Sequence, residues 1–156
     1  MHKRMFIVCA IAVCSLVSAQ VAPRRSSIVV AKDPAAKGNV DVEQFRLSLG
    51  YLQEELGQSK TEPPGVLVLC LTQQTAGALG IGDGIYLQRA TEPRGVHSPY
   101  YEVLLTREYS TRDYVFMADK ILESHYGLAL DSAARNALID RVIRKLNTTV
   151  SISALH

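Results

Sequence analysis

Apolar residues recur at helical spacing in three segments of the chain. In residues 41–58 they are separated by three or four positions, which places them on one stripe: Val42, Phe45, Leu49, Leu52 and Leu56. Asp41 stands where a helix N-cap is favoured, and Gly57 follows the last apolar position. The pattern predicts an amphipathic helix that packs onto its own domain. The same stripe offers a second use, as the seam of a homodimer.

The second helical segment covers residues 111–126 and ends at Gly127, a residue that favours helix termination. Its apolar face is broad: Val115, Ala118, Ile121, Leu122 and His125. Asp119 and Glu123 lie one turn apart on the opposite side of this helix. We expect both carboxylates to be solvated, because exposed acid pairs are the usual case on a helix surface.

The third segment covers residues 131–147 and carries a wide apolar stripe from Ala134 to Leu146. Its charged residues are expected on the solvent side of the helix: Arg135, Asp140, Arg141, Arg144 and Lys145. The remaining residues, 148–156, are predicted to form a short edge strand or a frayed end.

Three short segments have the composition of strands. Residues 66–72 are apolar and rich in valine and leucine, as in a strand that is covered on both faces. Residues 85–90 and 100–109 show the alternation of strands with one wet face. Between the first two strands, the glycines are spaced G-x-x-G-x-G-x-G, which matches neither a dinucleotide fingerprint nor a Walker loop. Asp83-Gly84 is instead typical of a hairpin turn.

These elements predict an α+β fold: an N-terminal amphipathic helix, a three-stranded antiparallel meander, and two C-terminal helices packed on the sheet. We divide the chain into residues 1–19, 20–40 and 41–156. The last is a single α+β domain, a size at which one core is expected. Residues 20–40 are predicted to be a flexible arm, with an extended conformation for residues 27–31.

The first 19 residues have the three parts of a secretory signal peptide. A basic start is followed by an apolar run from Met5 to Val17, and small residues precede a cleavage site after Ala19. The run is shorter than the roughly 20 apolar residues of a membrane span. We therefore predict a secreted protein, extracellular or, in a bacterium, periplasmic, with no membrane attachment after cleavage. Arg24-Arg25 is a candidate dibasic processing site.

Removal of residues 1–19 changes the charge and the cysteine content. Two of the 17 basic residues leave with the signal, so 15 basic residues balance 15 acidic ones. A neutral chain has no overall attraction for nucleic acid, and no nucleic-acid partner is expected. Cys70 is then the only cysteine, which excludes an internal disulfide. Its apolar neighbours indicate a buried, unreactive thiol.

No catalytic, metal or cofactor motif is assembled in the sequence, and we expect no cofactor and no metal site. The histidines lack a second ligand at metal-binding spacing, and no nucleophile elbow is present. His125 is interpreted as a core or boundary histidine.

One loop has the composition of a recognition surface. It gathers Arg94, His97, Tyr100 and Tyr101, which are residue types favoured at binding hot spots. The alternative interpretation is that the two tyrosines only begin a strand, one facing in and one facing out. Separately, Asn147 begins an Asn-Thr-Thr acceptor sequon, which predicts N-glycosylation in a eukaryotic host.

The function that these observations favour is that of a small secreted binding or interaction module without catalysis of its own. Its partner is a protein or a small molecule that the sequence does not identify. Two alternatives remain open at this point. One is a secreted, hydrolase-like enzyme whose site assembles only in the fold, with His97 or His125 as the acid–base group. The other is a precursor that is processed at Arg24-Arg25.

Overall fold

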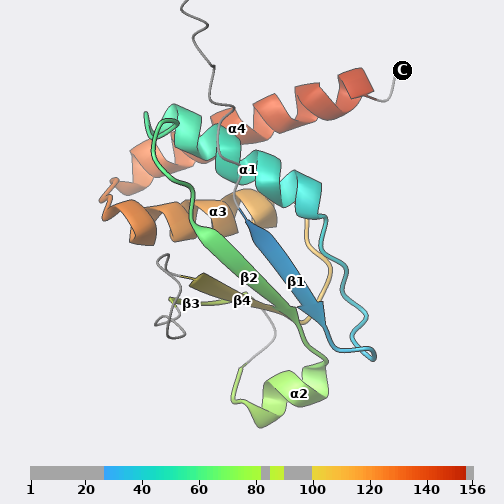
Figure 1. Cartoon of the computed structure of the whole chain (residues 1–156). Coiled ribbons are helices and arrows are strands. Elements are labelled where there is room, and N and C mark those ends of the chain that lie inside the picture. The colour runs from blue at the N-terminus through green and yellow to red at the C-terminus, as the bar shows by residue number, and fades with distance from the viewer. Residues whose placement is uncertain (1–26, 82–84, 90–99, 154–156) are drawn as a thin grey trace, which may run out of the picture.

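The computed structural model describes residues 27–81, 85–89 and 100–153, and it is an α+β structure (Figure 1). Its elements are, in chain order, β1 (Ile28–Lys32), α1 (Val42–Glu55), β2 (Gly65–Cys70), α2 (Gln73–Ala78), β3 (Tyr86–Arg89), β4 (Tyr100–Leu105), α3 (Thr111–Tyr126) and α4 (Ser132–Ser153). The long helices α1, α3 and α4 contact one another and lie together on one side of the sheet, and the short helix α2 lies beyond the end of β2 (Figure 1).

The four strands form one mixed sheet in the order β1-β2-β4-β3. β2 is central and parallel to both neighbours, pairing Val68 with Val30 on one side and with Val103 on the other. Only β3 runs antiparallel, beside β4. The predicted three-stranded antiparallel meander is therefore wrong. A parallel neighbour needs a crossover connection, and α1 provides it between β1 and β2.

The predicted hairpin between residues 66–72 and 85–90 is also wrong as a pairing, because β4 lies between β2 and β3. Asp83 and Gly84 themselves lie outside the described residues. β2 occupies the middle of the sheet, where both of its backbone edges are paired, and it carries apolar side chains on both faces. The expected extended conformation near residues 27–31 is observed as β1, which adds a strand to the sheet.

The first predicted helix is confirmed, and its stripe faces its own domain. The Asp41 carboxylate accepts a hydrogen bond from the Gln44 amide at 2.9 Å, which caps the helix start. Phe45, Leu49 and Leu52 are fully buried. The burial of these three residues supports packing within the domain, and the use of the stripe as a dimer seam stays a prediction.

The helix predicted over residues 111–126 is confirmed as α3. A reciprocal capping box between Ser110 and Asp113 begins it, and Gly127, with a φ of 64°, ends it in the left-handed conformation. The Tyr114 hydroxyl accepts a 2.8 Å hydrogen bond from the Asp41 amide, so the start of α3 is tied to the start of α1.

The last helix is longer than its apolar stripe predicts, because α4 continues to Ser153. The prediction of an edge strand or frayed end in residues 148–153 is therefore wrong. The hydroxyls of Thr148 and Thr149 donate to the carbonyls of Arg144 and Lys145, each at 3.0 Å. The Thr149 hydroxyl also lies 2.9 Å from the Tyr51 hydroxyl of α1, so tertiary contact holds this part of α4.

The core lies between the helical layer and one face of the sheet. It joins Phe45 and Leu49 of α1, Ile121 of α3 and Val142 of α4 to the inward residues of β2 and β4. Cys70 belongs to this core, which confirms the predicted burial of the thiol, and burial raises its pKa. Within the described part of the chain, none of the helices has the length and apolar character of a membrane span.

Candidate functional site

The two faces of the sheet have different surroundings. Side chains alternate along a strand, and Val66, Val68 and Cys70 of β2 point into the core with exposures of 1% or less. Leu67 and Leu69 point to the opposite side, remain half-buried, and are not part of the core cluster. The central strand therefore carries leucines on a face that the layer of α1, α3 and α4 does not cover.

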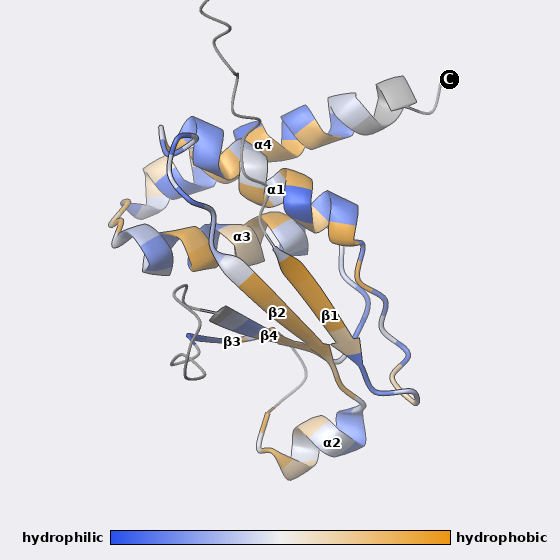
Figure 2. Ribbon diagram, viewed as in Figure 1, coloured by the Kyte–Doolittle hydropathy of each residue, from blue (hydrophilic) through white to orange (hydrophobic). Residues whose placement is uncertain are grey.

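This opposite face carries apolar side chains on all four strands. The register places Val29 and Ala31 beside Leu67 and Leu69, Leu104 beside Leu69, and Tyr86 beside Leu104. We call these six residues the open face. Val29 is 51% exposed and Tyr86 46% exposed, whereas Leu104 is buried. Gln88 and Glu102 are paired on the same side, in line with Leu67 and Val29, so the open face borders directly on polar side chains. Figure 2 shows the apolar character of β1 and β2.

β1 adds an edge to this surface. The carbonyl of Ser27 accepts from Val66 at 2.8 Å and the amide of Asp33 donates to Cys70 at 2.9 Å. Backbone groups alternate along a parallel ladder, so the N–H and C=O groups of Val29 and Ala31 also point toward β2. The N–H and C=O groups of Ile28, Val30 and Lys32 point outward. β1 is the first strand in the sheet order, so these outward groups lie at the sheet edge.

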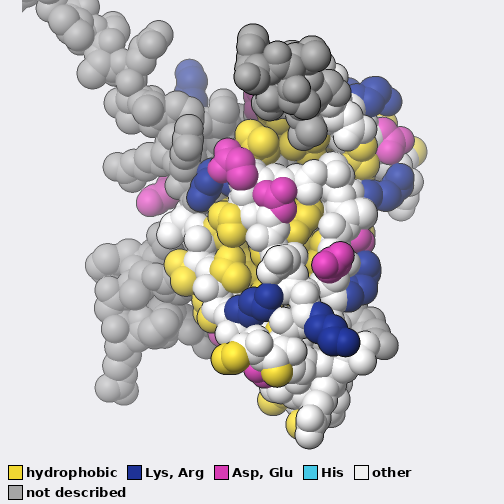
Figure 3. Space-filling view, turned by 90° about the vertical axis from the view of Figure 1, so that its right-hand side faces the viewer, with side chains coloured by type: hydrophobic (Ala, Val, Ile, Leu, Met, Phe, Trp, Pro, Cys, Tyr) yellow, Lys and Arg dark blue, Asp and Glu magenta, His cyan; other side chains and the backbone are white. Residues whose placement is uncertain are grey.

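The described chain that follows β1 continues beyond the carboxyl end of this strand. It crosses the carboxyl ends of the strands, where Gly38 lies so close to the Arg107 carbonyl that an added Cβ would be 3.0 Å from it. It then reaches Asp41 and α3. The Lys32 ammonium donates to Asn39 of this connection at 2.9 Å. Figure 3 views the molecule from the right-hand side of Figure 1 and shows hydrophobic side chains interspersed with charged and other side chains on this side.

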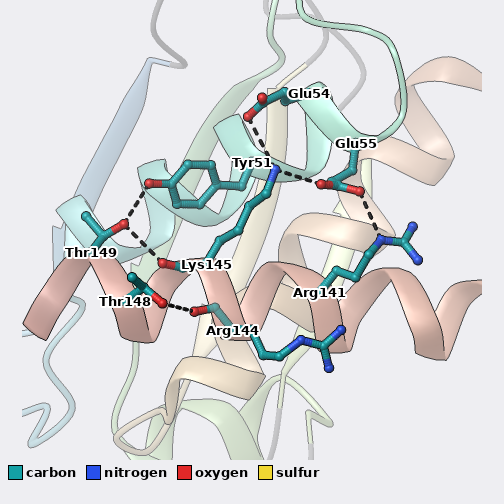
Figure 4. Close-up of a pocket in the computed structure, with 8 residues that line it drawn as sticks. All are labelled: Tyr51, Glu54, Glu55, Arg141, Arg144, Lys145, Thr148 and Thr149. Atoms are coloured by element: carbon teal, nitrogen blue, oxygen red, sulfur yellow. Dashed lines mark hydrogen bonds and ion pairs between the residues drawn. The ribbon is translucent and has the colours of Figure 1, made fainter.

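A polar groove of about 580 Å³ separates α1 from α4 (Figure 4). Arg141 binds Glu55 at 3.0 Å, and Lys145 binds Glu55 at 2.7 Å and Glu54 at 3.7 Å. The hydrogen bonds from Lys145 and Arg141 lower the pKa of Glu55, and the bond to Glu55 raises the pKa of Lys145. These charges bind one another across the groove, and the ion pairs join the two helices.

Only part of the predicted recognition loop lies within the described residues. Arg94 and His97 are outside them, and so is the side chain of Tyr100 at the start of β4. Tyr101 is fully buried, which fits the alternative interpretation of a strand residue that faces inward. Its hydroxyl lies 3.5 Å from Nδ1 of His125. The loop as a recognition surface stays a prediction that rests on Arg94 and His97.

His125 is a boundary residue between α3 and the sheet. It is half-buried, and its ring meets the edges of the Tyr101 and Tyr126 rings at centroid distances of 6.1 and 4.8 Å. Burial lowers its pKa, while the hydrogen bond that its ring donates to the backbone of Glu62 partly opposes this effect. A half-buried, aromatic-packed histidine of this kind contributes to the packing of α3 against the sheet.

The expected solvation of Asp119 is wrong, because its side chain is only 3% exposed and meets Arg135 of α4. Asp119 Oδ2 and Arg135 Nε are 3.2 Å apart, without the alignment of a hydrogen bond. Arg135 also pairs with Glu123, so this arginine lies between two carboxylates of α3 and off the predicted wet side of α4. Sequence periodicity places a charge on a helix face but does not show which neighbouring helix covers that face.

The predicted modification sites have different outcomes. Asn147 is exposed on α4, where its glycosylation stays a prediction. Ala19 lies outside the described residues. Among the residues that the structure does describe, no group of three side chains has the arrangement of a metal site. Comparison of the chain with protein-family models, with curated proteins and with solved structures finds no match.

Proposed function

We propose that this protein is a secreted, non-catalytic interaction module that binds a protein partner through the open face and the adjoining β1 edge. The observation that carries the proposal is the half-exposed state of Val29 and Tyr86 on a sheet face that also bears Leu67 and Leu69. Secretion is inferred from the signal pattern of residues 1–19.

Parallel strands are usually covered on both faces, and their side chains are therefore apolar on both. Full burial of a valine or leucine side chain stabilises by about 1.5–3 kcal/mol. Val29 retains 51% of its exposed surface, so a partner that covers it gains about 1 kcal/mol from this residue. Several such residues, bordered by the polar side chains of Gln88 and Glu102, have the composition of a protein interface.

Site-specific photo-crosslinking tests the proposal. A photoreactive residue is introduced at Val29, at Tyr86, and at the control position Asn136. Asn136 is exposed and belongs to α4, outside the sheet. We expect the same partner to be captured from Val29 and Tyr86 in the secreting host's medium, and none from Asn136.

The captured partner is then purified and its affinity is measured by titration. We expect Val29→Asp to weaken binding at least about tenfold, since a charge at the centre of an apolar contact must be desolvated. Equal capture at all three positions, or unchanged affinity for Val29→Asp, would contradict the proposal.

A further inference from the structure

We propose that the β1 edge pairs with the β1 edge of a second copy of this chain, in antiparallel orientation, and joins two four-stranded sheets into one continuous sheet. The inference rests on the proposed function, because it names a second copy as the occupant of the β1 edge and leaves the open face to the protein partner.

The outward N–H and C=O groups of β1 are suited to pairing with a second copy of the strand. Ile28, Val30 and Lys32 direct their N–H and C=O groups outward, since Ser27 and Asp33 at either end bond to β2. A two-fold axis at Val30 places this residue opposite its own copy and places Ile28 opposite the second copy's Lys32. In an antiparallel ladder each such pair exchanges two hydrogen bonds, so the three pairs form about six.

The side chains that meet in this register are compatible. Val30 meets Val30, Ile28 meets the stem of Lys32, and on the open face Val29 meets Ala31, so no like charges stand directly opposite each other. An edge lysine usually prevents strand association. Here the Lys32 ammonium is bonded to Asn39 of its own chain at 2.9 Å, which holds the charge at the end of the strand.

The described connection after β1 contacts the chain that follows β4. Gly38 lies beside the Arg107 carbonyl, and the Asp41 amide bonds the Tyr114 hydroxyl at the start of α3. An antiparallel pair has its two-fold axis perpendicular to the sheet, so both helical layers lie on one side. The two open faces then join into a single larger surface on the other side.

The contact is small, and we therefore expect a weak dimer that depends on protein concentration. A strand edge buries less than the roughly 1,000 Å² of a stable interface. Sedimentation equilibrium of the purified protein should show a mass that rises toward that of a dimer as its concentration approaches about 1 mM, the range in which weak interfaces associate.

A charge-swap experiment tests the register. Val30→Lys and Val30→Glu each place like charges opposite each other at the axis, and we expect each variant alone to dimerise at least about tenfold more weakly. An equal mixture of the two should recover the association, because the introduced lysine and glutamate then face each other. Asn136→Lys changes the net charge equally at an exposed position of α4 and should dimerise like the unchanged protein. Circular dichroism confirms that each variant is folded.

The outcomes separate the dimer from the proposed function. A protein that remains monomeric at every concentration, or a mixture that does not recover association, overturns the dimer. If Val29 and Tyr86 nevertheless capture the same other protein, the proposed function stands. If neither association nor capture occurs, both are overturned.

Discussion

Replacing Arg135 by methionine tests how the helical layer is held together. Arg135 extends from α4 to Asp119 and Glu123 of α3, and its side chain is 19% exposed. The substitution Arg135→Met keeps most of the apolar stem and removes the charge. It leaves the carboxylate of Asp119 in a site where it is 3% exposed and has lost its cation.

The magnitude follows from this burial. Removing one partner of a buried ion pair costs about 3–5 kcal/mol of unfolding free energy. Arg135 and Glu123 are partly exposed, so we place the cost of Arg135→Met at about 2–3 kcal/mol, below the fully buried range. For a domain of this size, that corresponds to a decrease in Tm of roughly 5–12 °C.

The cost should depend on pH with a definite sign. Burial raises the pKa of Asp119, Arg135 opposes that effect, and Glu123 adds to it. The folded state therefore holds the Asp119 proton more strongly than the unfolded state. Any stability from this group is fully present below the unfolded pKa and is lost as pH rises through the folded one. Removing Arg135 raises the folded pKa further, so the cost of the substitution should be large at neutral pH and small below about pH 4.

Urea unfolding at neutral and acid pH measures both quantities. Arg112→Met is the matched control, because Arg112 is 69% exposed and its nearest carboxylate oxygen, on Asp140, is 4.0 Å away. We expect this control to cost less than about 0.5 kcal/mol at either pH. An equal cost for the two substitutions, or a cost of Arg135→Met that grows in acid, would refute the reasoning.

Three further predictions concern the backbone, the thiol and the processing of the chain. Gly50→Ala should stabilise the protein by about 0.5–1 kcal/mol, since an added Cβ in α1 meets nothing within 4 Å. Gly127→Ala should destabilise the protein by about 1 kcal/mol, because the φ of Gly127 is 64°. Thermal unfolding of both variants checks these opposite signs. Cys70 should react with a thiol reagent only upon unfolding, so its reaction rate in urea should follow the unfolding transition and not the thiolate fraction. Mass spectrometry of the secreted chain should find an N-terminus at Gln20 and, from a eukaryotic host, a glycan mass on the peptide that contains Asn147; retention of residues 1–19 would remove the basis for secretion.

The helices were predictable from sequence because their signals are local. Apolar residues repeat within α1 and α3, Asp41 and Ser110 cap their starts, and Gly127 ends α3. Each of these features is decided by residues within a few positions along the chain.

The strand pairing was not predictable in the same way. Asp83-Gly84 is a local turn signal, but the partner of β2 is determined by the crossover through α1 and by the insertion of β4 beside β2. Parallel pairing joins segments that are far apart in sequence, and the composition of a strand does not identify its neighbour.

The candidate site was only partly predictable for a related reason. The apolar run of β2 indicated a strand covered on both faces, and the structure places one of those faces outside the helical layer. The loop with Arg94 and His97 drew attention through its composition, whereas the short sequence of β1 carries no motif. Its importance comes from its position at the sheet edge. Asp119 and Arg135 were missed because charges pair between helices, which periodicity within one helix does not show.

Amide hydrogen exchange of β1 tests the central claim most directly, because it reports which backbone groups face the sheet edge. In dilute protein, the amides of Val29 and Ala31 should exchange slowly and the amide of Val30 rapidly, since only the first two face β2. Raising the protein concentration should slow the exchange of Val30 without changing that of Val29. A Val30 amide that is already protected in dilute protein, or that exchanges equally fast at every concentration, would contradict an open edge that binds a second copy.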